Sequence, residues 1–311
     1  MRNLLILIII PIIIYSQNYN GPESIEYNSN NGSYYISNSN NGQILELNND
    51  NDLSVFTSNI NTGGPHGLEL VGQTLFVCSG SNLLGYNWFG NQILNYDMDG
   101  VFLNGITQRW EGDENDIIDL FITDFSGKKL YHYSIAENTH YEVCSFDKNP
   151  NGVYYDYINS RLLVVFWGWN APVYEVNIES GTYNTIINTG LSNLDGITMD
   201  QCGNFYISAW SSNAIHKYNS DFTETEIIIE GMSNPADICF NESDNIIGIP
   251  NSGNNTVEFI NYSCDNTNTT EHIRKNEIIF STNLLGQSDN QSKFQFNIYN
   301  DGTIDKIYIL K

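Results

Sequence analysis

The feature that most constrains this chain is a sequence unit of about 40 residues that recurs along most of its length. Each copy has a turn ending in a small residue, a short apolar strand, a polar hairpin turn, a second strand, a loop and a third strand. The aligned first-strand residues of five copies are Ile25, Leu68, Val153, Ile197 and Ile238. Their spacings are 43, 85, 44 and 41 residues, so the long gap holds one more copy and the total is six.

Six repeats of this length predict an all-β, six-bladed β-propeller, because sheets stacked radially around an axis bury faces that one sheet leaves open. The turns are rich in Asn, Gly and Asp, as hairpins require. A β-sandwich is the alternative, but it has no reason to repeat its sequence six times. We find no convincing helical periodicity.

The repeat within the long gap has two candidate starts. Its second strand begins near Leu120, and either Asn115-Asp116-Ile117 or the segment "LNGIT" from Leu103 to Thr107 can precede it. The second choice matches the fifth repeat but leaves too few residues after Tyr96 for an outer strand. We therefore place the start at Asn115.

Both ends of the chain read differently from the repeats. An apolar run from Leu4 to Ile14, followed by Ser16 and Gln17, has the length of a secretory signal and is too short for a membrane span. A polar segment after Cys264 reads as a linker, and the residues beyond it form two or three alternating strands of a small C-terminal β tail domain. The expected organisation is a signal peptide at 1–16, the propeller at 17–265, a linker at 266–276 and the tail domain at 277–311.

Charge and cysteine content narrow the function classes. The formal net charge is −24 with only 12 Lys and Arg residues, so the chain lacks a phosphate-neutralising surface and nucleic acid is not an expected partner. Most of this charge serves solubility. The five cysteines are too widely spaced for a zinc motif, and Cys239 with Cys264 is the disulfide to test first.

In a propeller, the residues just before the first strands converge on one mouth of the central channel. These are almost all oxygen donors, which suit Ca²⁺ or Mg²⁺, with Mn²⁺ or Zn²⁺ possible. Asp and Asn can instead form turns in front of Gly67, Gly152 and Gly196, whereas Glu is a poor turn former. The mouth residues are Glu23, His66, Asn115 or Asp116, Asn151, Asp195 and Asp237.

Aromatic residues are expected near the same mouth. Four tryptophans, Trp88, Trp167, Trp169 and Trp210, lie in loops that we assign to one rim, where they can serve as a stacking platform for a ring-shaped ligand. Sequence motifs of serine hydrolases, zinc proteases, phosphate loops and dinucleotide-binding folds are absent. The remaining histidines, His132, His140, His216 and His272, are expected at the surface.

Repeats that begin "PES", "ND", "PNG" and "LDG" resemble the senescence marker protein and gluconolactonase family of propellers over residues 20–264, and more loosely the NHL repeat proteins. The resemblance implies one divalent cation, usually calcium, held by Glu23, Asn151 and Asp195. It also implies that Asn115 faces the substrate and that Asp195 is the general base. The third repeat departs from the family pattern and reads as shortened.

The last segment resembles the C-terminal sorting domain of the bacterial type IX secretion system, in which "LLG" precedes a "YNDGT" hairpin and a strand ending in Lys, here Lys311. That resemblance implies secretion or display at the cell surface, with the type IX machinery as a partner. An added strand that completes the sixth blade is the alternative.

The leading hypothesis is a secreted, monomeric, cation-binding propeller that hydrolyses a lactone or related ester. In it, the metal acts as a Lewis acid, Asp195 activates water, and the substrate contacts are Asn115, His66, Asp237, Trp167, Trp169 and Trp210. The alternative is a non-catalytic, NHL-like propeller that binds a glycan or protein. A structural surface protein is a third reading.

Overall fold

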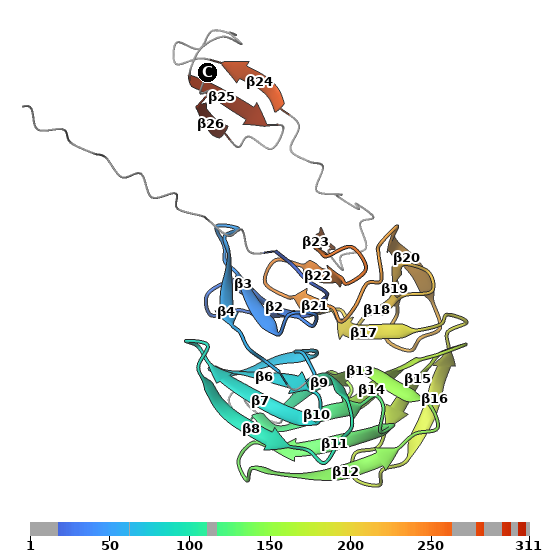
Figure 1. Ribbon diagram of the computed structural model, residues 1–311. Coiled ribbons are helices and arrows are strands. Elements are labelled where there is room, and N and C mark those ends of the chain that lie inside the picture. Colours follow the sequence, from blue (N-terminus) through green and yellow to red (C-terminus); the bar gives the residue numbers. More distant parts are fainter. Residues whose placement is uncertain are drawn as a thin grey trace, which may run out of the picture.

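A computed structural model describes residues 18–61, 63–110 and 117–262 of the chain, together with three strands of the C-terminal segment. Six antiparallel sheets follow one another in chain order around a central axis (Figure 1). Five of these sheets have four strands, and the sixth has three among the described residues. The chain is therefore a six-bladed β-propeller, which confirms the fold that the repeat predicts.

Each blade runs from an innermost strand beside the channel to an outermost strand at the perimeter. The innermost strands are β1 (Pro22–Asn28), β5 (Leu68–Val71), β9 (Leu103–Trp110), β13 (Asn149–Asp156), β17 (Leu194–Met199) and β21 (Cys239–Asn241). The second strands are β2 (Ser33–Asn38), β6 (Thr74–Ser79), β10 (Ile117–Asp124), β14 (Arg161–Trp167), β18 (Phe205–Ala209) and β22 (Ile246–Asn251). The third strands are β3 (Gln43–Leu47), β7 (Asn82–Asn87), β11 (Lys129–Ser134), β15 (Pro172–Val176), β19 (Ala214–Tyr218) and β23 (Thr256–Asn261). The outermost strands are β4 (Leu53–Thr57), β8 (Gln92–Asp97), β12 (Thr139–Ser145), β16 (Tyr183–Asn188) and β20 (Thr225–Glu230).

The hydrophobic core lies between the blades. Every residue of β2 and of β18 is buried, because a second strand is covered on both faces by neighbouring blades. Leu163 and Val165 of the fourth blade, for example, pack in one cluster with Ile197 and Phe205 of the fifth. Each repeat thus completes its core only against the next one, which explains why the sequence unit recurs.

The ring closes where the sixth blade packs against the first. Cys239 lies in one buried cluster with Ile25, and the Asn241 side-chain amide donates a hydrogen bond to the Tyr34 hydroxyl at 2.9 Å. Closure therefore brings together residues separated by about two thirds of the chain.

The start of the third blade differs from the prediction. Its innermost strand is β9, so "LNGIT" opens the blade and the predicted start at Asn115 is wrong. The turn between β6 and β7 contains only Gly80 and Ser81. Tyr96 therefore belongs to the outermost strand β8, whereas the prediction placed an outer strand after it. The third blade therefore has four strands and is not shortened. Asn115 lies outside the described residues.

Two expectations about polar side chains in the blades are corrected. Cys239 is a buried free thiol and Cys202 is disulfide-bonded, so the predicted bridge through Cys239 is wrong. His132 and His216 are buried on third strands rather than exposed. A polar partner on a neighbouring element explains each: His132 Nε2 lies 2.7 Å from Asp119 Oδ1, and His216 Nε2 lies 2.8 Å from the Ser212 hydroxyl.

The C-terminal segment contains a three-stranded antiparallel sheet of β24 (Ile278–Thr282), β25 (Phe294–Tyr299) and β26 (Ile304–Tyr308). The predicted signal peptide at 1–16 and the predicted linker at 266–276 lie outside the described residues, as does His272. Within the part of the chain that the structure describes, no helix is long and apolar enough to cross a membrane.

Candidate functional site

One polar residue of each blade stands at the same end of the channel, at or just before the start of its innermost strand. Hydrogen bonds between main chains fix this ring: Gly67 N donates to Asn104 O, and Asp237 N donates to Glu23 O, both at 2.9 Å. Five of the six residues are those expected, and Asn104 occupies the place predicted for Asn115. We refer to the set as the mouth ring, which consists of Glu23, His66, Asn104, Asn151, Asp195 and Asp237.

The glycines that follow the ring residues allow the blades to approach closely and do not form left-handed turns. Gly105, Gly152 and Gly196 are absent from the residues with positive φ among the described glycines. A Cβ atom on Gly105 would lie 2.5 Å from Asn151 O, and one on Gly152 would lie 2.4 Å from Asp195 O. The Asn and Asp side chains before these glycines are therefore not required for turns and remain available for a site.

Asn151 links three blades at the mouth. Its side-chain oxygen accepts a hydrogen bond from the Asn104 amide, and its amide nitrogen donates to Leu194 O at 3.1 Å. The same side chain stabilises the charged form of the Asp195 carboxylate. Asn151 is 2% exposed, and these two hydrogen bonds hold its amide between the third and fifth blades.

Three carboxylates in the ring lie close enough to repel one another. Burial, followed by the charge of Asp237, raises the pKa of Glu23 to about 7. Burial also raises the pKa of Asp237 to about 7, and burial with repulsion from Glu23 raises that of Asp195 well above its usual range. Among the described residues, no Lys or Arg forms a salt bridge with any of the three. The mouth thus carries negative charge that the described side chains leave uncompensated.

His66 is a neutral group in this ring. Burial lowers its pKa, and its Nδ1 lies 3.1 Å from Gly64 O. Since a carbonyl oxygen only accepts, Nδ1 must carry the proton, which leaves the lone pair on Nε2. His66 can accept a proton or a hydrogen bond at the mouth.

Aromatic rings form a continuous arc around one side of the mouth, from the second blade to the fifth. Successive ring centroids are separated by 4.6 Å (His66 to Phe102), 5.9 Å (Phe102 to Phe125), 6.1 Å (Phe125 to Trp167) and 4.9 Å (Trp167 to Trp210). Phe102 and Phe125 were not predicted, because phenylalanine in a turn carries no pattern that separates a ligand wall from ordinary packing.

Of the four predicted tryptophans, three lie at the mouth end of their blades and one lies at the opposite end. Trp167 and Trp210 belong to the aromatic arc, and Trp169, in the turn between β14 and β15, is 84% exposed. Trp88 lies in the turn between β7 and β8, at the opposite end of β7 from the turn between second and third strands. Its assignment to the same rim is therefore wrong, because the loop was taken for the wrong connection.

The indole nitrogen of Trp210 is a buried donor beside Asp195. It lowers the pKa of that carboxyl, yet no hydrogen bond of normal geometry joins the two among the described residues. A buried donor of this kind normally has an acceptor. We therefore place Trp210 at the functional face rather than in the core alone.

The predicted cation ligands, Glu23, Asn151 and Asp195, lie in one ring, and their donor set suits a hard cation. Two carboxylates and an amide offer oxygen atoms, and their uncompensated charge would be neutralised by a divalent ion. No group of three or more His, Cys, Asp or Glu residues with metal-binding geometry occurs in the described chain, so a site here needs the Asn151 amide.

Comparison with known proteins supports the β-propeller fold alone. No family model matches the sequence, and no curated protein matches it in sequence. Solved structures share its fold: a streptogramin B lyase aligns with a TM-score of 0.58 at 14% identity, covering 96% of this chain and 86% of that one. A protein of unknown function from Bacteroides thetaiotaomicron gives 0.63 at 13% identity, covering 79% and 70% of the two chains. A chain of a nidogen/laminin complex gives 0.60 at 15% identity, covering 71% and 86%.

Proposed function

We propose that this protein binds one divalent cation, calcium in the first instance, through Glu23, Asn151 and Asp195, and holds a small ring-shaped ester against the aromatic arc. The observation that supports this most is the convergence of two carboxylates and an amide, from three blades, in a mouth with no compensating Lys or Arg salt bridge. The reaction we propose is hydrolysis of a lactone or related ester.

Each group at the mouth has a role in that reaction. A bound cation would act as a Lewis acid toward the ester carbonyl. Asp195, whose pKa burial and repulsion raise, accepts a proton from water. His66 and Asp237 position the polar side of the substrate, and the rings of Trp167 and Trp210 contact its apolar face.

The alternative function is cation-dependent binding of a glycan or protein without catalysis. It is favoured by Trp169, whose side chain is almost fully exposed beside the mouth and contributes little to the core. Exposed tryptophan near carboxylates suits stacking against a sugar ring.

The two functions are separated by assaying purified protein for metal content and for turnover of a panel of small lactones, with and without chelator. We expect calcium to copurify or rebind, and chelation to abolish turnover. Because a lyase shares the fold, products of elimination should be measured alongside products of hydrolysis. Cation binding without turnover of any compound would favour the binding function.

We also propose that the protein is exported, with residues 1–16 removed as a signal peptide and the C-terminal segment recognised by the type IX machinery. Mass spectrometry of extracellular material should find an N-terminus near Gln17 and loss of the segment after about Asn276. Extracellular protein that retains Met1 or Lys311 would contradict the respective part of this proposal.

A further inference from the structure

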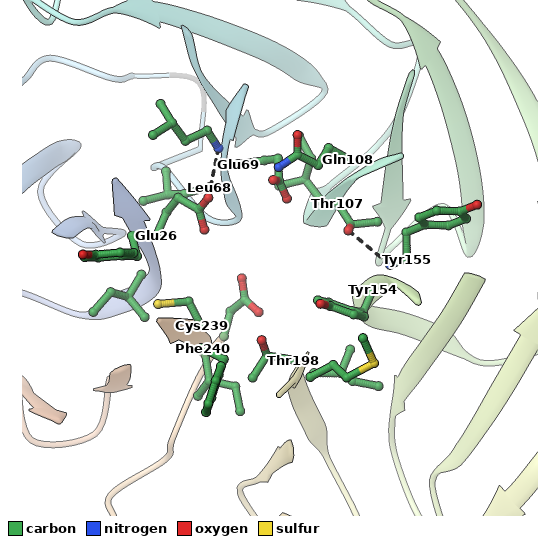
Figure 2. Close-up of a pocket in the computed structure, with 18 of the residues that line it drawn as sticks. Glu26, Leu68, Glu69, Thr107, Gln108, Tyr154, Tyr155, Thr198, Cys239 and Phe240 are labelled. Carbon is green, nitrogen blue, oxygen red and sulfur yellow. Dashed lines mark hydrogen bonds between the residues drawn. The ribbon is translucent and has the colours of Figure 1, made fainter. Parts of the chain in front are cut away.

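A cavity lies in the central channel, toward the end opposite the mouth ring. Its volume is about 710 Å³, and its outer lining includes residues of the turns between first and second strands. Figure 2 shows the side chains that project into it from the innermost strands. Of the mouth-ring residues, Asp237 alone is also part of its described lining.

Equivalent positions of the six innermost strands surround the cavity but differ in chemistry. The first two blades contribute the carboxylates Glu26 and Glu69, whereas the other blades contribute hydroxyl or thiol groups. The six positions are Glu26, Glu69, Thr107, Tyr154, Thr198 and Cys239. Asp237 of the sixth blade also lines the cavity, so one side of the channel is acidic.

The charge of this acidic side is not compensated. No Lys, Arg or His occurs among the described residues that line the cavity. Glu26 accepts one hydrogen bond, from Leu70 N at 3.2 Å, and Glu69 interacts with Gln108. Burial raises the pKa of Glu26 to about 8, and burial with repulsion from Glu26 raises that of Glu69. A bound cation would remove the repulsion.

A second observation indicates a missing hydrogen-bond donor. The side-chain oxygen of Gln108, which lines the same cavity, is buried and accepts no hydrogen bond from the described residues. Buried acceptors in proteins are almost always satisfied. A ligand with N–H groups would satisfy this oxygen and the two carboxylates together.

The rest of the lining suits an organic ligand better than a bare metal ion. The cavity is much larger than a hydrated ion requires, and the rings of Tyr27, Tyr154 and Phe240 line it. Aromatic rings beside carboxylates bind ammonium groups through cation–π attraction and contact with the alkyl part. No group of three acidic, His or Cys residues in the described chain could hold a metal here.

We propose that this channel cavity is a second site that binds a small primary ammonium compound, with the ammonium group between Glu26, Glu69 and Gln108 and its carbon chain against the tyrosine rings. The described lining of this site includes none of the three proposed cation ligands, Glu23, Asn151 and Asp195, and it meets the mouth ring at Asp237.

Calorimetric titration with butylammonium tests this, at constant ionic strength and a pH of about 9, where Glu26 is ionised and an alkylamine is still charged. We expect saturable binding of butylammonium, none of butanol, and weaker binding of tetramethylammonium, which has the charge but no N–H donor. The double variant Glu26→Gln, Glu69→Gln should weaken binding by at least about tenfold. Glu230→Gln, the same change on the exposed outermost strand β20, should not.

Melting curves establish that each variant is folded, and Asp195→Asn should bind butylammonium like the wild type, because Asp195 does not line the cavity. Equal binding of butanol, unchanged binding by the double variant, displacement of butylammonium by calcium, or no saturable binding by the wild type would each overturn the proposal.

Discussion

The third and fifth blades begin with almost the same five residues, Leu103 to Thr107 ("LNGIT") and Leu194 to Thr198 ("LDGIT"). Their scaffolds are equivalent. Gly105 N donates to the Thr123 hydroxyl at 2.8 Å, and Gly196 N donates to the Ser208 hydroxyl at 2.7 Å. In both cases that hydroxyl donates in turn to a carbonyl of the next blade.

The two blades differ in the one side chain that matters for chemistry. Asn104 is neutral and donates to Asn151, whereas Asp195 is a carboxyl group that repels Glu23 and Asp237. The comparison shows that the propeller fixes the backbone of these two blades in the same way and places a different side chain at the mouth of each.

The shared scaffold predicts the largest effect. A Cβ on Gly196 would lie 2.6 Å from Ile238 N, and one on Gly105 would lie 2.5 Å from Asn151 O, both backbone atoms that cannot move easily. Gly196→Ala and Gly105→Ala should each lower the free energy of unfolding by about 3 kcal/mol or more. Chemical denaturation measures this.

Gly72→Ala is the control for that experiment. Gly72 has positive φ but no atom within 4 Å of its Cβ position, so alanine should cost only about 1 to 2 kcal/mol there. A scaffold account would be contradicted if Gly72→Ala were as damaging as the other two variants, or if Gly105 tolerated alanine and Gly196 did not.

Exchange of the two mouth residues tests the effect of the carboxyl group that the fifth blade has and the third blade lacks. Asp195→Asn gives the fifth blade the side chain of the third, and it should remove the calcium-dependent gain in stability, about 2.7 kcal/mol at one hundred times Kd. Asn104→Asp adds a carboxylate, so it should lower stability in chelator and keep the calcium response. Melting curves of both variants with and without calcium measure these effects, with Glu230→Gln as the control. An unchanged calcium response in Asp195→Asn would exclude Asp195 as a ligand.

The pH dependence of the chelated protein tests the repulsion at the mouth. Burial and the charge of Asp237 raise the pKa of Glu23 to about 7, above its value in an unfolded chain of about 4.5. Between these values the unfolded state loses its proton first, so the stability that Glu23 contributes in acid is lost as pH rises through this range. The loss should be about 3 kcal/mol in denaturation curves, and calcium should restore it. A chelated protein equally stable at both ends of the range would contradict the raised pKa.

The tryptophans at the mouth predict the smallest effect. Trp169→Ala should leave the melting temperature nearly unchanged, because the side chain is exposed, while weakening binding of a ring-shaped ligand by about 1 kcal/mol. Trp167→Ala should weaken it similarly and lower stability slightly, since Trp167 packs against Trp210. Fluorescence titration measures the binding; wild-type affinity in both variants would remove Trp167 and Trp169 from the ligand site.

The fold and most of the mouth ring could be predicted from the sequence, because both follow from the repeat. Each repeat has the same strand order, so the residue before the first strand falls at the mouth whichever blade it belongs to. The prediction failed in the third blade, where the two-residue turn at Gly80 and Ser81 concealed strand β7. The match of "LNGIT" with "LDGIT" indicates the start of the third blade correctly.

Other features could not be predicted because they depend on contacts between strands and blades. His132 is buried because Asp119 faces it from the neighbouring strand β10, and pairing registers are not readable from one sequence. Phe102 and Phe125 join the aromatic arc through ring contacts with His66 and Trp167 of the neighbouring blades. The acidic side of the channel likewise arises from Glu26 and Glu69 on adjacent blades.

The central claim is that Glu23, Asn151 and Asp195 hold one cation. Calorimetric titration of chelator-treated wild-type protein with calcium, repeated on Glu23→Gln, tests it most directly. We expect a single site per chain in the wild type, absent from the variant, with a matching calcium-dependent rise in melting temperature. A wild type that shows neither binding nor a change in melting with calcium, magnesium, manganese or zinc would contradict the claim, and the proposed hydrolysis with it.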